Sequence, residues 1–503
     1  MTTSEIGILI AIIVYMVGVV GIGVYFAKKN STTNDFYLGG RKLGPLVTAM
    51  SAEASDMSSW LLMGLPGLAY LTGVADAAWT AIGLAIGTYV NWLIVAKRIR
   101  KYTHGCSAIT IPDFFANRYR DRKMLKCVSA IIIIIFFVPY TASGFAKLFN
   151  SLFGVDYLTA MIISAIVIVA YTTLGGFLAA STSDFIQSII MSIALVIVLS
   201  YGIISVGGFD GVVAHVGDLK GFLSITSTHD GATNTATPYS VLSIASTLAW
   251  GLGYFGMPHI LLRFMAIEDT KKLKLSRRVA SVWVVISMSV AVSIGIIGYA
   301  MSAEGVIPNL KDSETIIVQI AHVLSTHGII FAIIAGVILA GILASTMSTS
   351  DSQLLAASSS VSENLLEGVL SLNLSSGVKI VVARGSVIII SIIAMFLASN
   401  PNSSVFQIVS FAWAGFGATF GPVMLFALFW KRSNKYGAIS GMVAGGIMVF
   451  VWKFLVRPMG GVLGIYELLP AFIVASIFIV VVSLLTPAPE KEIVDEFEAI
   501  KNY

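Results

Sequence analysis

The segment Ser51–Trp60, with the sequence SAEASDMSSW, places polar side chains inside an otherwise apolar run from about residue 45 to residue 70. Asp56 could do electrostatic chemistry there, because an ionised carboxylate near the middle of a bilayer costs several kcal/mol unless something pairs with it. Hydroxyl residues beside such an acid can leave the helix and turn oxygens toward a cation, where protein or a wet cavity satisfies the backbone. We therefore predict a broken helix that holds an ion. The alternative is a packed, serine-rich helix whose acid pairs with a neighbouring helix.

A second interruption, Trp250–His259 (WGLGYFGMPH), lies within the apolar run 239–266. Glycines and a proline stand there where a straight helix would not favour them. Trp250 and Tyr254 are four residues apart, so on a helix they share a face and could wall an apolar ring or chain. Close helix packing would explain the glycines, but it leaves the proline and the histidine unexplained. The run is predicted to be broken.

A third polar group lies in Ser345–Ser352 (STMSTSDS). Hydroxyl residues recur there at spacings of three and four and therefore share one helical face: Ser345, Ser348, Thr349 and Ser352. Hard cations prefer clustered oxygen ligands, so a hydroxyl-lined face opposite Asp56 would suit Na⁺. Any one hydroxyl is better explained by a hydrogen bond to its own helix, but the four together with Asp351 favour ion binding. Asp184 either faces the same route toward the cytoplasm or caps a helix that starts there.

The composition is that of a membrane protein. Apolar residues make up 57% of the 503 residues and charged residues 11%, against about 25% in soluble domains. The mean hydropathy is +0.90, and the two cysteines have no metal-site spacing. Runs long enough to cross a bilayer fall near residues 6–27, 45–70, 77–96, 125–149, 157–178, 185–206, 239–266, 279–301, 328–355, 379–398, 405–430, 437–455 and 466–486. We predict about thirteen transmembrane helices.

Basic residues collect in alternate loops, above all in residues 97–126 and 271–278. The positive-inside rule then places the N-terminus outside and the C-terminus in the cytoplasm of a cell membrane. The net charge of +5 follows this pattern and gives no sign of nucleic-acid binding. Residues 207–238 are expected to form a solvated outer connection. Short helices are expected at residues 314–324 on the outer side and 111–119 on the inner side.

The two predicted breaks fall in the second and the seventh span, and each opens a group of five spans. Paired interruptions at corresponding positions of two halves are typical of inverted-repeat secondary transporters, which bind their solute near the bilayer midplane. We therefore expect one all-α transmembrane domain. Its predicted parts are an extra N-terminal helix (6–27), a first repeat (45–206), a second repeat (239–430), C-terminal helices (437–486) and a cytoplasmic tail (487–503).

Five motifs together resemble the solute:sodium symporter family, and most closely its bacterial sodium/proline symporters. They are Tyr37–Pro45 (YLGGRKLGP), Ser51–Gly67 (SAEASDMSSWLLMGLPG), Trp250–His259, Met347–Thr349 (MST) and Ala412–Pro422 (AWAGFGATFGP). The similarity runs from about residue 35 to residue 470. It implies a LeuT-like five-plus-five core with one helix before it and two behind. It also implies a bacterial Na⁺-coupled symporter, not an enzyme, that imports L-proline by alternating access.

The resemblance further implies Na⁺ as the coupling ion, no organic cofactor, and membrane lipid and a small solute as partners, with no obligate protein partner. The implied sodium ligands are oxygens of Ala54, Met57, Ser345, Ser348 and Thr349. Coupling between sodium and solute is expected to involve Asp56, Ser58, Asp184, Asp351 and Ser352. The implied proline pocket is lined by Ser59, Tyr140, Trp250, Tyr254 and Pro258.

Some positions depart from the pattern expected for the proline branch. Ser59 and Met257 border the implied pocket, so another amino acid or a carboxylate is the alternative solute. Glu53 and Asp351 add acids that could alter the ion stoichiometry or the pH dependence. An intramembrane aspartyl protease would need two acids, but the sequence has no G-x-G-D motif. A channel is a weaker rival, because paired broken helices favour carriers.

Overall fold

In the first half of the chain, apolar runs form a series of packed helices. The computed structural model describes residues 2–141, 157–397 and 404–502. The helices of this half are α1 Thr3–Ala27, α2 Thr33–Leu38, α3 Pro45–Ser59, α4 Leu65–Thr72, α5 Val74–Val90, α6 Ala96–Gly105, α7 Ile111–Arg118, α8 Met124–Thr141, α10 Tyr157–Ser205 and α11 Gly208–Val216. Irregular helical turns extend two of them, as η2 Trp60–Gly64 after α3 and η3 Asn91–Val95 after α5.

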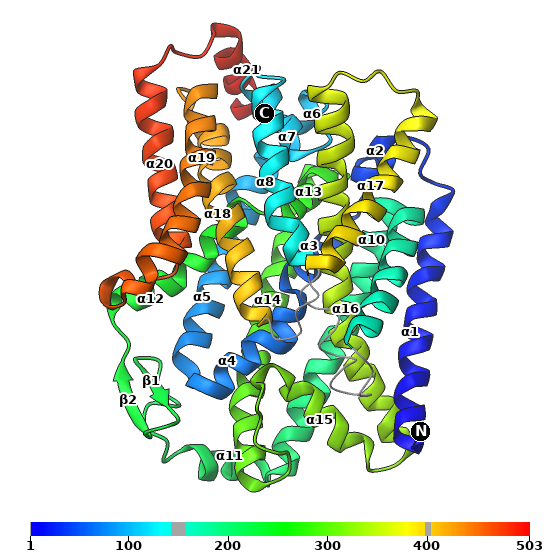
Figure 1. Ribbon diagram of the computed structural model, residues 1–503, viewed down its shortest axis with the longest axis vertical. Helices are drawn as coiled ribbons and strands as arrows, with labels where there is room; N and C mark the ends of the chain where they lie inside the picture. The colour runs from blue at the N-terminus through cyan, green and yellow to red at the C-terminus, as the bar shows by residue number, and fades with distance from the viewer. Residues whose placement is uncertain (1, 142–156, 398–403, 503) are drawn as a thin grey trace.

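The second half of the chain is likewise a series of packed helices. Its helices are α12 Val241–Leu248, α13 Pro258–Ala266, α14 Leu273–Glu304, α15 Ile316–Ser325, α16 Ile329–Ser359, α17 Ser376–Leu397, α18 Val405–Phe429, α19 Lys435–Val451, α20 Leu468–Leu485 and α21 Lys491–Asn502. A tight helical turn, η4 Ala249–Phe255, follows α12, and wider turns, η7 Ser360–Val369 and η8 Trp452–Val456, follow α16 and α19. The helices run roughly along the long axis of the molecule, with the two termini at opposite ends (Figure 1).

Most of the apolar runs expected from the sequence lie on helices that could span a membrane. Among the described residues, nine helices are long and apolar enough to cross a bilayer, and shorter apolar helices lie at Met124–Phe137 and Val241–Phe255. The runs predicted at 157–178 and 185–206 both lie in α10, in which two helical stretches meet at a kink at Gly176 (φ 58°, ψ −153°). A Cβ at Gly176 would lie 2.8 Å from the carbonyl oxygen of Phe36, so this close approach requires glycine. The total of thirteen spans stays a prediction.

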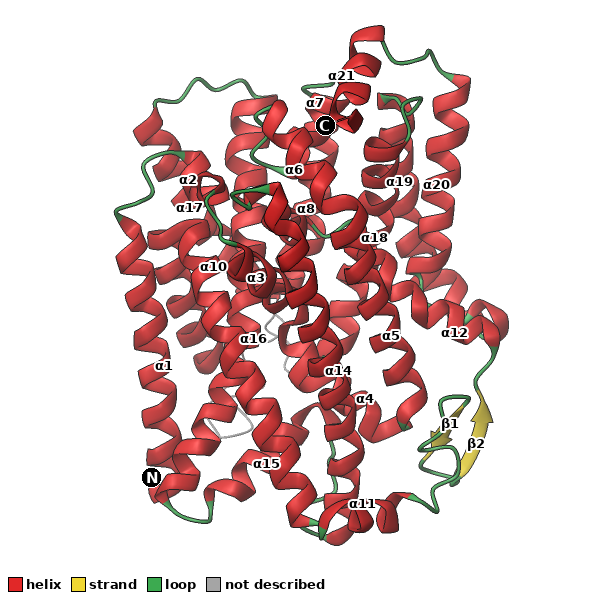
Figure 2. Cartoon of the chain, turned by 180° about the vertical axis from the view of Figure 1, so that it is seen from behind, coloured by secondary structure: helices red, strands yellow, loops and turns green. Residues whose placement is uncertain are grey.

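The connection predicted to be a solvated loop, residues 207–238, contains more structure than expected. It holds α11 and an antiparallel hairpin of β1 Ser227–Asp230 and β2 Thr235–Pro238, toward the end of the molecule that carries the N-terminus (Figure 2). The Asp230 carboxylate accepts a hydrogen bond from the backbone N–H of Ala232 (2.9 Å) and so closes the turn. The short helices expected on the two faces are confirmed as α15 and α7.

Both predicted helix breaks are confirmed. In α3 the backbone of Ser58 leaves the helical region (φ 47°, ψ −168°), and its hydroxyl accepts a hydrogen bond from the backbone N–H of Trp60 at 3.1 Å. In the other break, the chain passes from the η4 turn through an extended Met257 (φ −77°, ψ 108°) into α13, which begins at Pro258. Proline suits that first helical position because its missing N–H has no helical partner there anyway.

Candidate functional site

The two broken segments meet each other at the centre of the bundle. The hydroxyl of Tyr254 in η4 donates a short hydrogen bond to the carboxylate of Asp56 in α3, and both side chains are buried. The ring centroids of Trp60 and Trp250 lie 5.7 Å apart. Asp56 therefore faces the second break and not lipid, as expected for a paired intramembrane acid.

The first turn before the α3 break lies against α16, and this junction gathers oxygen atoms. The Ser348 hydroxyl donates to the carbonyl oxygen of Ala54 (2.8 Å) and lies 3.1 Å from the carbonyl oxygen of Ser345. The Thr349 hydroxyl lies 3.2 Å from the same Ser345 oxygen. Four of the five predicted sodium ligands are thus linked by direct contacts. The fifth, the carbonyl oxygen of Met57, accepts the backbone N–H of Trp60 and keeps a second lone pair.

These ligands fit an alkali cation by their chemistry. All are neutral carbonyl or hydroxyl oxygens, the donor type that hard cations select over nitrogen and sulfur. The hydroxyls of Ser348 and Thr349 contact the carbonyl oxygens of Ala54 and Ser345. Both hydroxyls can rotate and present a lone pair to an ion instead, because a hydroxyl is a donor and an acceptor. The hydrogen bonds to the helix's own backbone, which the sequence left as an alternative, are present as well. The Ser345 hydroxyl makes only such a bond, to Ile342 at 2.7 Å.

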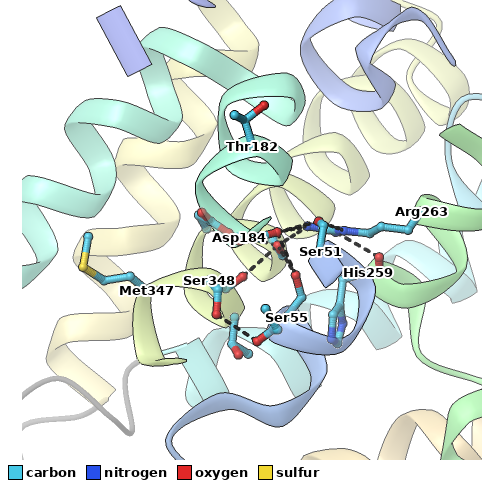
Figure 3. Close-up of polar contacts among 12 residues, drawn as sticks. Ser51, Ser55, Thr182, Asp184, His259, Arg263, Met347 and Ser348 are labelled. Carbon is cyan, nitrogen blue, oxygen red and sulfur yellow. Dashed lines mark hydrogen bonds and ion pairs between the residues drawn. The ribbon is translucent and has the colours of Figure 1, made fainter. Parts of the chain in front are cut away.

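A buried ionic cluster lies beside the oxygen cluster. The guanidinium of Arg263 in α13 donates to the carboxylate of Asp184 in α10 (3.0 Å) and to the hydroxyl of Ser352 (2.5 Å). The hydroxyls of Ser51 and Ser55 in α3 donate to the same Asp184 oxygen at 2.6 and 3.1 Å. Figure 3 shows how side chains from these separate helices converge on Asp184. The cluster ties α3, α10, α13 and α16 together, and Arg263 neutralises the acid.

The contacts of Asp184 and Asp351 differ from those that the sequence suggested. Because α10 runs unbroken past Asp184, this residue does not cap a helix, and the capping alternative is wrong. Its second oxygen, Oδ1, has no hydrogen-bond partner among the described residues. Asp351 accepts hydrogen bonds from Tyr171 (2.7 Å) and Ser352 (2.9 Å), so it faces α10.

A small cavity lies next to Asp56. It measures about 10 Å³, roughly the space of one water molecule. Its walls are Asp56, Met57, Trp60, Leu84, Trp250, Val409 and Trp413. A carboxylate, backbone oxygens at a break and three indole rings around one space suit a small solute with both a charged and an apolar part.

Aromatic rings lie between this cavity and a much larger vestibule of about 750 Å³, which we expect to open to the outside. Trp250 lines both spaces. Its ring stacks on Tyr466 with centroids 4.9 Å apart and lies 5.6 Å from Phe406. The indole N–H of Trp413 donates to the Trp250 carbonyl oxygen at 2.8 Å, which fixes η4 against α18. We call Trp60, Trp250, Phe406 and Tyr466 the aromatic wall.

Glu53 is a second buried carboxyl on the inner turn of α3. It accepts hydrogen bonds from the indole N–H of Trp92 (2.9 Å) and from the Thr88 hydroxyl (3.3 Å to each oxygen). These donors belong to α5 and η3, so Glu53 ties the first half of α3 to its neighbour.

The remaining predicted site residues fall at the breaks. Ser58 forms the α3 break, while Ser59 and Pro258 are buried beside the two interruptions. Tyr140 belongs to α8, but its side chain lies outside the described residues. The sequence reasoning missed Arg263 as a site residue. As the one basic residue inside the run 239–266, it could have been matched with an intramembrane acid.

Comparison with known proteins places these features in a family. The family model described as the sodium:solute symporter family matches residues 36–445. The chain is 42% identical to the osmoregulated proline transporter OpuE of Bacillus subtilis over 97% of its length and 96% of the relative. It is 43% identical to the high-affinity proline transporter PutP of Bacillus subtilis, covering 95% and 98% of the two chains. It is 40% identical to the sodium/proline symporter of Escherichia coli, covering 98% and 96%.

Solved structures support the fold. A Na⁺-coupled sialic acid symporter in a substrate-bound outward-open state superposes with a TM-score of 0.78 at 16% identity, over 96% of this chain and 99% of that one. The nucleobase-cation-symport-1 family transporter Mhp1 superposes with a TM-score of 0.56 at 12% identity, over 92% and 98%. The fold is therefore the LeuT-like one expected from the paired breaks, while the boundaries of the repeats stay predictions. With its two broken helices and a family match over most of its length, this chain belongs to the sodium:solute symporter family.

Proposed function

We propose that this protein imports L-proline together with Na⁺. The observation that carries the proposal is the junction of two broken helices, with an all-oxygen cluster on one side of Asp56 and an aromatic cavity on the other. Identity of 40–43% to proline transporters over nearly the whole chain supports proline as the solute. Another amino acid or a small carboxylate is the alternative, since Ser59 and Met257, which lie at the two breaks, depart from the pattern expected for the proline branch.

In this proposal Na⁺ binds between α3 and α16. The carbonyl oxygens of Ala54, Met57 and Ser345 and the hydroxyls of Ser348 and Thr349 hold the ion. Binding pulls the α3 break toward α16, because each helix contributes only part of the ligand set. Asp56, which is adjacent to the ligand Met57 and two residues from the ligand Ala54, transmits the change to the solute pocket through Tyr254.

Proline fits the chemistry of the cavity. Its carboxylate can meet backbone N–H groups left free where α3 and η4 are interrupted. Its ammonium can meet Asp56 or free carbonyl oxygens, and its ring can pack against Trp250 and Trp413. The present cavity holds about one water molecule, so the aromatic wall must move outward before proline is admitted.

Transport then follows from alternation between two closures. The aromatic wall closes the route to the outer vestibule, and the cluster of Asp184, Arg263 and Ser352 closes the opposite route. A ligand shifts such an equilibrium only by its difference in affinity for the two states. The membrane potential adds about 2.3 kcal/mol per charge per 100 mV, which drives an ion-coupled solute inward.

The test is uptake of radiolabelled L-proline into proteoliposomes with and without an inward Na⁺ gradient. The expected result is accumulation that needs Na⁺ and collapses when the gradient is dissipated. Excess unlabelled amino acids and small carboxylates, added one at a time, identify the preferred solute. Sodium-dependent uptake of another solute with no proline uptake would keep the symporter and replace the substrate. Equal uptake without Na⁺ would overturn the proposed coupling.

A further inference from the structure

A membrane-exposed groove lies apart from the transport pathway, between α10 and α14. Its volume is about 560 Å³, and its lining is almost wholly apolar. On α14 the lining residues Val282, Ile286 and Val290 recur every four residues and form one stripe. The first two are 59% and 58% exposed. The groove therefore opens sideways, to the surroundings of the helices.

The stripe ends in basic side chains. Arg278 lines the groove four residues, or about one helical turn, before Val282. Lys274 lies four residues before Arg278 and so on the same face of α14. Both are exposed, and neither forms an ion pair with any residue that the structure describes. Nearby Lys272, by contrast, is paired with Glu268 at 2.6 Å. The groove thus joins a long apolar channel to two cations without a protein counter-ion.

We propose that this groove binds an anionic phospholipid. Its phosphate would contact Arg278 and Lys274, and one acyl chain would lie along the α14 stripe. A guanidinium suits a phosphate because it can donate two parallel charge-assisted hydrogen bonds. Basic residues at the membrane surface attract anionic lipid by about 1 kcal/mol each, which corresponds to roughly fivefold enrichment per residue.

Charge complementarity favours a lipid over a second copy of the chain. Two copies in one membrane share an axis along the bilayer normal, so a symmetric contact through this groove would set like ends side by side. Arg278 and Lys274 of one copy would then face the same cations of the other. An anionic headgroup neutralises these charges, whereas a second copy doubles them.

The floor of the groove reaches the transport machinery. Met50 of α3 lines it, and the next residue, Ser51, donates to Asp184 in the ionic cluster. Trp283 of α14 also lines it and donates its indole N–H to Ser192 of α10 at 2.9 Å. An acyl chain in the groove therefore packs against the first half of the broken helix. Trp283 supplies an optical probe of the same space.

The experiment measures quenching of Trp283 fluorescence by phospholipids with brominated acyl chains, in vesicles that contain the full-length protein. The Trp283 signal is the difference between the protein and its Trp283→Phe variant. Brominated phosphatidylglycerol is expected to quench this signal at several-fold lower mole fraction than brominated phosphatidylcholine. Arg278→Gln should remove most of that preference, and Lys272→Gln, which deletes an already paired charge on the same segment, should leave it intact.

Two further measurements keep the outcome decisive. Val282→Phe fills the groove without touching the cations and without adding a second indole, and it should weaken quenching by both lipids. Equal quenching by the two lipids, or a preference that survives Arg278→Gln together with Lys274→Gln, would overturn the proposal. Efficient cross-linking between two copies through Val282→Cys would also overturn it, because a second chain would then cover the groove. None of these readouts depends on transport, so they stand apart from the test of proline uptake.

Discussion

A matched pair of serine substitutions on α16 tests the proposed sodium site most sharply. The Ser348 hydroxyl bridges to Ala54 on the broken helix at 2.8 Å, whereas the Ser345 hydroxyl bonds only to Ile342 of its own helix at 2.7 Å. If both residues are ligands as proposed, Ser348 contributes its side chain and Ser345 contributes its backbone carbonyl. Alanine removes the ligand atom at the first position and keeps it at the second.

The expected size follows from these contacts. A hydroxyl that interacts with a charge contributes about 1.5–3 kcal/mol, and the neutral hydrogen bonds lost from the ion-free state offset about 1 kcal/mol of that. The net loss for Ser348→Ala is about 0.5–2 kcal/mol, which raises the half-saturating Na⁺ concentration roughly two- to thirtyfold. Ser345→Ala should change it by less than about twofold, because a bond to the same helix adds little.

The assay is initial-rate proline uptake into proteoliposomes over a range of Na⁺ concentrations, with choline keeping the ionic strength constant. The maximal rate at saturating Na⁺ separates weaker ion binding from damaged protein. Equal shifts for the two variants would refute the assigned ligand set. A loss of maximal rate at unchanged sodium affinity in Ser348→Ala would refute the proposed role of its hydroxyl.

Three further substitutions probe the neighbouring contacts. Asp56→Asn should raise the half-saturating Na⁺ concentration or abolish uptake, because it weakens the charged partner of the Tyr254 hydroxyl; unchanged sodium dependence in the uptake assay would contradict this role. Trp250→Ala should weaken proline affinity more than sodium affinity, since its ring walls the solute cavity; a competition binding assay measures both, and equal losses would indicate general unfolding. Arg263→Gln should destabilise the protein by about 3–5 kcal/mol by leaving a buried carboxylate unpaired, and adding Asp184→Asn should restore much of the loss in a thermal-unfolding assay; a double variant no more stable than the single one would contradict the pairing.

The positions of the breaks could be predicted because their residues conflict with a straight helix. Serines around Asp56 and the glycine-proline stretch before His259 indicated where each helix would stop, and the structure places the stops at Ser58 and Met257. The hydroxyl face of α16 followed from spacing alone. These signals are local, so the sequence carries them without reference to packing.

Contacts between distant helices were beyond the sequence. The pairing of Arg263 with Asp184 joins residues 79 positions apart. Neither segment carries a local pattern that indicates which other segment it contacts. Asp351 looked like part of the hydroxyl face, yet a side chain two positions past Thr349 points toward Tyr171 of α10. Gly176 gave no signal that a residue with positive φ would divide the long helical segment α10 at that position.

Trp250 borders both the outer vestibule and the cavity beside Asp56. A rotation of this one indole therefore changes how fast a solute arrives and how long it stays. The rate constants for solute entry and for solute release therefore depend on the same side chain. A substitution at this position is expected to change both. Substitutions of Trp250 that slow solute release are therefore expected also to slow solute entry.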